Sequence, residues 1–253
     1  MTGLGTRVAV GVAMGAVAAV ALWLGGVVFW AFVTVLTLVA LAEWAALRGA
    51  DRLRTMVALL FLAVPLVLAL PMLWGPVREA VALLAVLAIV LAASAGNHGT
   101  GLGIAYLGGA AIGILFLRGE PQGLMLALWT LLVVIATDTG AFFAGRSIGG
   151  PKLAPAISPN KTWAGLAGGV IAAGVVGALV AWAGGLPRAM MWLGAPLAVV
   201  AQGGDLYESL LKRRAGAKDS GRLLPGHGGV FDRIDGAIPV VMAVALLVAG
   251  GAL

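Results

Sequence analysis

The chain has 253 residues, of which 62% are hydrophobic and 10% are charged, and its mean hydropathy is +1.09. Soluble domains carry about 25% charged residues, so this composition excludes a soluble domain and predicts an all-α, polytopic integral-membrane bundle. The net charge of +6 is typical of cytoplasmic loops beside anionic lipid, and we expect no nucleic-acid partner. Because cysteine is absent, disulfides, thiolate nucleophiles and cysteine-ligated metals are also excluded.

Apolar runs separated by short polar turns fill the first half of the chain. The run from Val8 to Ala46 spans 39 residues, enough for a helix of about 58 Å against a hydrocarbon core of about 30 Å, so it predicts two spans that turn at Gly25-Gly26. A cleaved signal peptide is the alternative for the first span, but no small-x-small site precedes a polar mature start. Glu43, near the end of the second span, is interpreted as snorkelling to the interface. The nine predicted spans are 8–24, 27–46, 55–74, 80–95, 102–117, 123–144, 163–183, 189–206 and 237–253.

Basic residues divide unevenly between the two sides that nine spans would define. Thirteen of the 16 Lys and Arg residues fall at the N-terminus or in the loops after even-numbered spans, and the other three are Arg78, Arg118 and Arg188. This positive-inside bias predicts that the N-terminus and the loops 145–161 and 205–236 face the cytoplasm and the C-terminus does not. We expect one membrane domain, 1–253, with N-terminal helices in 1–117 and a catalytic half in 118–253.

The longest polar stretch runs from Gly204 to Gly236 and holds five of the ten acidic and six of the 16 basic residues. If the eighth span continues as a helix, Asp205, Ser209 and Lys212 share one face. A helix that starts near Val230 would direct Asp232 and Asp235 the same way. Carboxylates hold hard cations and Lys and Arg hold phosphates, so the stretch predicts a Mg²⁺-polyphosphate site. The alternative is a solvated loop balanced by salt bridges.

Three further places leave two interpretations open. The glycine-rich loop 225–229 could bring backbone N–H groups close to phosphates, and its His227 is either a proton shuttle or phosphate donor or a structural residue. Asp138 is either functional or merely ends its helix. The segment 158–162 either caps the seventh span through Ser158 or Thr162 or binds phosphate through Lys161 and the hydroxyls.

Two motifs carry a family resemblance. The segment 209–235 contains Ser-x-x-Lys-Arg, Lys-Asp, Pro-Gly-His-Gly-Gly and Asp-Arg-x-Asp in that order, and 152–163 reads Lys-Leu-Ala-Pro-Ala-Ile-Ser-Pro-Asn-Lys-Thr-Trp after Gly145-Arg146. The chain thereby resembles the phosphatidate cytidylyltransferases (CDP-diacylglycerol synthases). It departs from their pattern at Asn160, often Lys, and at Ala164, often Glu.

The resemblance implies that CTP and phosphatidic acid react in the bilayer to give CDP-diacylglycerol and pyrophosphate. It implies a divalent metal, expected to be Mg²⁺, on Asp205, Asp232 and Asp235, and it leaves open a second, monovalent cation and a homodimer. The residues assigned to catalysis are Asp205, Ser209, Lys212, Lys218, Asp219, His227, Asp232 and Asp235. The residues assigned to substrate binding are Asp138, Arg146, Lys152, Ser158, Lys161, Thr162, Arg213 and Arg233. The expected location is the bacterial inner membrane, with the site facing the cytoplasm.

Two rival classes remain. A cation or proton transporter would use Asp138 and Asp205 inside the bundle, but its charges would be scattered over several spans in inverted repeats. A phospholipid synthase that consumes CDP-diacylglycerol would share the Asp232-Arg-Ile-Asp235 pattern, but further paired carboxylates at helical spacing are missing.

Overall fold

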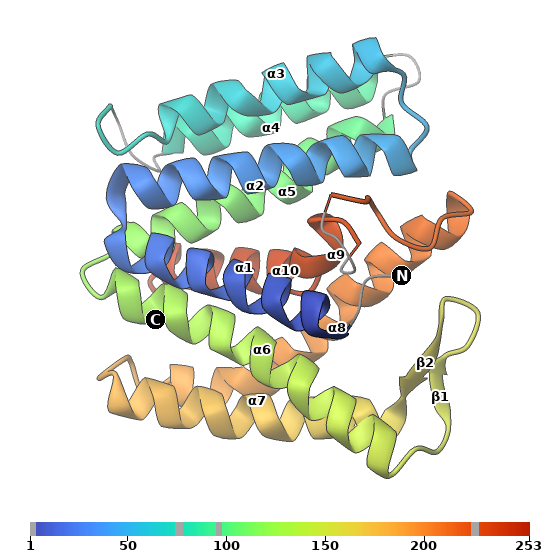
Figure 1. Ribbon diagram of the computed structural model, residues 1–253. Coiled ribbons are helices and arrows are strands. Elements are labelled where there is room, and N and C mark those ends of the chain that lie inside the picture. Colours follow the sequence, from blue (N-terminus) through green and yellow to red (C-terminus); the bar gives the residue numbers. More distant parts are fainter. Residues whose placement is uncertain (1–3, 74–77, 95–97, 224–227) are drawn as a thin grey trace. The chain divides into compact units, whose positions relative to one another are not determined.

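The chain folds into two compact units made almost entirely of helices (Figure 1). The residues that the computed structural model describes are 4–73, 78–94, 98–223 and 228–253. Unit 1 combines residues 1–120 with 214–234, and unit 2 combines 121–213 with 235–253. The polar stretch is therefore shared between the units, because its middle part belongs with the N-terminal helices.

Unit 1 is built around one deeply buried helix. Its helices are α1 (Leu4–Leu24), α2 (Gly26–Leu47), α3 (Arg52–Leu68), α4 (Arg78–Ala93), α5 (His98–Gly119) and α9 (Phe231–Ile234). Helix α5 contacts α2, α3 and α4, and the short α9 lies against α2. A Cβ on Gly101 of α5 would lie 2.5 Å from the carbonyl oxygen of Ala88, so only glycine lets α4 approach this closely.

Unit 2 contains a tight helical pair that carries a hairpin at its end (Figure 1). Its elements are α6 (Gly123–Ser147), β1 (Lys152–Ala154), β2 (Ser158–Thr162), α7 (Trp163–Ala183), α8 (Met190–Arg214) and α10 (Ala237–Ala249). Helices α6 and α7 touch along their glycines, where a Cβ on Gly140 would lie 2.6 Å from the carbonyl oxygen of Gly168. The indole N–H of the buried Trp129 donates to the carbonyl of Gly177 at 2.7 Å and fixes the same pair.

The loop predicted at 145–161 is more ordered than expected. Helix α6 continues to Ser147, and β1 and β2 then pair antiparallel, with Lys152 opposite Thr162. This hairpin is the one sheet within the described ranges, and it is a small exception to the predicted all-α fold. The Thr162 side chain accepts the N–H of Gly165 at 3.0 Å, so Thr162, not Ser158, caps α7.

Each of the nine predicted spans overlaps one helix in the part of the chain that the structure describes, although the third, predicted to end at residue 74, already ends as α3 at Leu68. Four of these helices are long and apolar enough to cross a membrane, namely α2, α5, α6 and α7. The apolar parts of α1 and α10 are shorter. A membrane protein is therefore supported, whereas the number of nine transmembrane helices stays a prediction.

Candidate active site

Helix α8 extends well beyond the predicted end of its span at residue 206. It continues to Arg214, so Asp205, Ser209 and Lys212 do share a face, as predicted. Gly204, on α8, faces the segment that leads into α10. A Cβ there would collide with the carbonyl oxygen of Asp235 and lie 2.8 Å from Pro239. The glycine therefore lets the segment before α10 pack directly on α8, which brings Asp235 beside Asp205.

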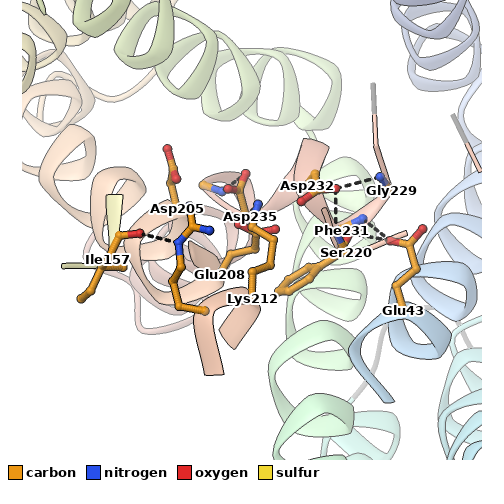
Figure 2. A network of polar contacts seen from close by, with 12 residues as sticks. Glu43, Ile157, Asp205, Glu208, Lys212, Ser220, Gly229, Phe231, Asp232 and Asp235 are labelled. Carbon is orange, nitrogen blue, oxygen red and sulfur yellow. Dashed lines mark hydrogen bonds and ion pairs between the residues drawn. The ribbon is translucent and has the colours of Figure 1, made fainter. Parts of the chain in front are cut away.

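Three carboxylates of unit 2 converge at this place (Figure 2). One oxygen from each of Asp205, Glu208 and Asp235 lies within 4.8 Å of the others. The Glu208 side chain is 1% exposed, and the other two residues are half-buried. Oxygen-rich sets of this kind suit hard divalent cations. Glu208 had no role in the sequence interpretation, although its position three residues after Asp205 on the same helix could have revealed it.

Two lysines balance part of this negative charge. The ammonium group of Lys161, on β2, forms an ion pair with Asp205 and donates to the amide oxygen of Gln202 at 2.9 Å. The ammonium group of Lys212 lies 2.7 Å from an oxygen of Glu208. Lys161 on the hairpin and Lys212 on α8, both assigned to the site from the sequence, therefore lie at the carboxylate cluster.

The surroundings of Asp235 change its affinity for a proton. Burial, the largest cause, and the negative charge of the neighbouring Asp205 together raise its pKa from 3.8 to about 7. The N–H of Gly236, 2.9 Å from Oδ1, and the charge of Lys161 lower the pKa, while Asp138 on α6 raises it. Asp138 is therefore close enough to act on this site electrostatically. Burial and the negative charge of Asp205 therefore both favour the protonated form of Asp235 near neutral pH when no other cation is bound.

Asp232 belongs to unit 1, where it organises a loop. Its Oδ2 accepts the backbone N–H of Ser220 at 3.0 Å and that of Gly229 at 2.8 Å (Figure 2). The expected single helix carrying both Asp232 and Asp235 is wrong, because α9 ends at Ile234 and a turn follows. Asp235 and Gly236 form this turn between α9 and α10.

Glu43 is the second residue that the sequence interpretation missed. It is 9% exposed and accepts hydrogen bonds from Ser220, Val230 and Phe231, so the interpretation as an interfacial snorkelling residue is wrong. The signal was present, since an acidic residue in an apolar helix is a functional candidate by default.

The other predicted site residues lie on several elements. The side chain of Arg213 donates to the carbonyl of Ile157 at 3.3 Å and so connects α8 to the hairpin. Arg146 lies in the last turn of α6, Lys152 lies on β1 and Ser158 on β2. Exposed positions are occupied by Lys218, Asp219 and Arg233. His227 lies outside the described residues.

Comparison with known proteins adds the decisive observation. The model of the family described as "Cytidylyltransferase family" matches residues 5–250. The chain belongs to the cytidylyltransferase family. A phosphatidate cytidylyltransferase of Brucella suis biovar 1 (strain 1330) is 41% identical over 266 residues, which cover 100% of this chain and 95% of that relative.

Two more distant bacteria also have relatives with this name. The phosphatidate cytidylyltransferase of Helicobacter pylori (strain ATCC 700392 / 26695) is 40% identical over 163 residues, covering 63% of this chain and 60% of the relative. That of Bacillus subtilis (strain 168) is 42% identical over 133 residues, covering 51% and 49%. Membership of the cytidylyltransferase family agrees with the resemblance found in segments 152–163 and 209–235.

For a cytidylyltransferase, the geometry of unit 2 has a direct chemical meaning. Nucleotidyl transfer gathers phosphate oxygens from two substrates at one place, so the protein must supply cations there. Lys161 and Lys212 reach the site from different elements, and Asp205, Glu208 and Asp235 offer oxygens to a hard cation. The arrangement can therefore hold both a metal ion and phosphate groups.

Proposed function

We propose that this membrane protein is a phosphatidate cytidylyltransferase. The observation that carries the proposal is the match across nearly the whole chain, both to the family model and to the Brucella relative. An oxygen of the phosphatidate phosphate attacks the α-phosphorus of CTP, the bond to the β-phosphate oxygen breaks, and pyrophosphate leaves. The product is CDP-diacylglycerol. No covalent protein nucleophile is needed, since phosphatidate is itself the nucleophile.

The chain's own residues would bind and orient the two phosphate groups. Lys161 and Lys212 provide ammonium groups at the carboxylate cluster, and both are largely buried, with side-chain exposures of 15% and 16%. Charges at such sites are screened less by water, so they stabilise phosphate oxygens more strongly than surface lysines do. Arg213, which connects α8 to the hairpin, and Arg146, in the last turn of α6, are further candidates.

Mg²⁺ fits the donor set at the cluster, because three carboxylate oxygens within 4.8 Å are hard ligands of matching charge. Asp205, Asp235 and Glu208 would hold the ion. That Asp232 is also a ligand, as expected from the sequence, is a separate hypothesis. When bound, Mg²⁺ would neutralise negative charge on phosphate oxygens. A direct test is Mn²⁺ binding followed by electron paramagnetic resonance, where Asp205→Asn should weaken binding and Glu79→Gln, at an exposed acidic residue with no assigned role, should not.

The reaction is tested with purified protein, CTP, phosphatidate and Mg²⁺. With CTP labelled at the α-phosphate, label should enter the lipid, and with CTP labelled at the γ-phosphate it should appear in pyrophosphate. Lipid labelling from the γ-phosphate would indicate a kinase instead. Equal turnover with ATP would contradict the nucleotide assignment.

The membrane setting is also part of the proposal. The charge bias and the bacterial relatives support the inner membrane with the site facing the cytoplasm, where CTP is present. The rival of an ion transporter has no support from the family match. Ion flux into proteoliposomes without CDP-lipid formation would restore it.

A further inference from the structure

Glu43 on α2 lies buried against two backbone segments that are far from it in sequence. Its Oε1 accepts the N–H of Val230 at 3.0 Å. Its Oε2 accepts the N–H of Phe231 at 2.8 Å and the hydroxyl of Ser220 at 3.0 Å (Figure 2). One carboxylate therefore connects both arms of the segment that joins α8 to α9, all within unit 1.

The chain closes around this carboxylate by means of two glycines. A Cβ on Gly221 would collide with Oε1 of Glu43. A Cβ on Gly229 would collide with Oε2 of Glu43 and with the Ser220 hydroxyl. We call Ser220, Gly221, Gly229, Val230 and Phe231 the loop base. No larger residue fits at either glycine without displacing the carboxylate.

Neighbouring contacts hold both sides of this arrangement. Trp44, next to Glu43, packs edge-on against Phe231 at 5.5 Å between ring centroids, and its indole N–H donates to Gly99 at 2.8 Å. On the other side, Asp232 accepts N–H groups from Ser220 and Gly229. Two carboxylates, one from α2 and one from α9, therefore fix the loop base together.

A buried carboxylate is tolerated only when protein hydrogen bonds replace those it would make to water. The hydrogen bonds from Ser220, Val230 and Phe231 do this for Glu43, whereas a purely interfacial role would not require them. We propose that Glu43 is a positioning residue: it holds the loop base so that Lys218, Asp219 and Asp232 keep the backbone geometry that the reaction requires. The inference rests on the proposed function, and no contact between Glu43 and substrate is implied.

The test uses the full chain in detergent with two variants that disturb the same contact from opposite sides. Glu43→Gln keeps the side-chain length, but its NH₂ group must face the N–H of Val230 or of Phe231. Gly221→Ala adds a Cβ against the carboxylate without changing α2. Both variants should speed amide hydrogen exchange at Val230 and Phe231 by roughly tenfold or more, measured without substrates. Both should also lower kcat by roughly tenfold when the assay is run well below their melting temperatures.

Matched controls are Glu79→Gln, at an exposed acidic residue, and Gly15→Ala, where a Cβ meets nothing within 4 Å. Unchanged exchange in both test variants would overturn the inference. Faster exchange with unchanged kcat would also overturn it, by reducing Glu43 to a structural residue. If Glu43→Gln does not fold, Gly221→Ala decides. A wild type that forms no CDP-lipid would refute the proposed function instead, and the exchange result would still show whether Glu43 holds the loop base.

Discussion

Asp232 and Asp235 are three positions apart in the sequence but have different surroundings. One oxygen of Asp232 accepts two backbone N–H groups in unit 1, whereas Asp235 lies beside Asp205 and Glu208 in unit 2. The same residue type therefore accepts backbone N–H groups at one position and forms part of a carboxylate cluster at the other. Substitutions that keep shape and remove charge distinguish these roles.

For Asp232→Asn we expect an almost inactive protein that remains folded. The Asn carbonyl can still accept the N–H groups of Ser220 and Gly229, but the charge that a divalent cation requires is lost. On the separate hypothesis that Asp232 also binds the ion, its loss should lower the rate roughly a hundredfold or more, at about tenfold per 1.4 kcal/mol. The measurement is CDP-lipid formation across a Mg²⁺ titration, with thermal melting as the control for folding.

Arg214→Gln is the comparison for this variant, since Arg214 is exposed at the end of α8 and should tolerate the change. A near wild-type rate for Asp232→Asn at low Mg²⁺ would contradict the hypothesis that Asp232 is a metal ligand. Loss of activity together with fast exchange of the Gly229 amide would assign it a structural role.

Asp235 predicts a pH dependence of stability in metal-free detergent. Its pKa is about 7 in the folded protein and near 3.8 when unfolded, so the folded state binds the proton more tightly. This stabilisation is complete below about pH 3.8 and is lost as the pH rises to about 7, by up to about 1.4 kcal/mol per pH unit. Asp235→Asn should therefore gain thermal stability relative to wild type between pH 5 and pH 8.

The change in melting temperature with pH, measured in EDTA, tests this difference. Asp219→Asn serves as the control because Asp219 is exposed. Parallel curves for wild type and Asp235→Asn would show that Asp235 is ionised throughout.

At the scale of elements, α8 sets the spacing of the side chains in the candidate site. Asp205, Glu208 and Lys212 are placed on one face by helical periodicity, and Lys161 reaches the same face from the hairpin. The helix must remain in register for these groups to meet. The hairpin is in turn connected to α8 by the hydrogen bond from Arg213 to Ile157.

Inserting one alanine after Tyr207 should abolish most activity. The insertion rotates Glu208 and Lys212 by about 100° relative to Asp205 while leaving the helix intact. We expect at least a tenfold loss of rate and of Mn²⁺ affinity, with unchanged helical circular dichroism. Insertion between Gly149 and Gly150 is the control, because a Cβ on either glycine would meet nothing within 4 Å. Full activity after insertion in α8 would contradict the shared face.

For the whole molecule, the number of transmembrane helices is the property to be measured. Four helices qualify by length and composition within the described ranges, and two other apolar helices are shorter. The uneven distribution of Lys and Arg provides independent information about sidedness. The expected homodimer also stays a prediction, to be checked by light scattering of the purified protein.

The nine-span topology predicts opposite sides for two positions. A reporter fused at Arg54 should be cytoplasmic, and one fused at Leu253 should lie on the other side of the membrane. Alkaline phosphatase and green fluorescent protein fusions provide complementary signals for each side. Both positions reporting the same side would refute nine spans.

The sequence by itself determined the class of protein, the positions of the helices and the polar segments that carry the chemistry. Hydrophobic runs of this length have few alternatives to helices, since a membrane requires every backbone group to be satisfied within its own segment. The face shared by Asp205 and Lys212 was likewise predictable, because helical periodicity is a local property. The family resemblance rested on short motifs whose order can be read directly from the chain.

Only the tertiary structure decided which distant residues meet. Glu43 contacts Ser220 and Phe231 across more than 170 positions, and no local periodicity encodes such a pairing. The separation of Asp232 from Asp235 into different units depended on a turn after Ile234 and on how each flank packs. Long-range contacts of this kind follow from complementary burial of polar groups and close glycine packing, which arise only when the helices come together.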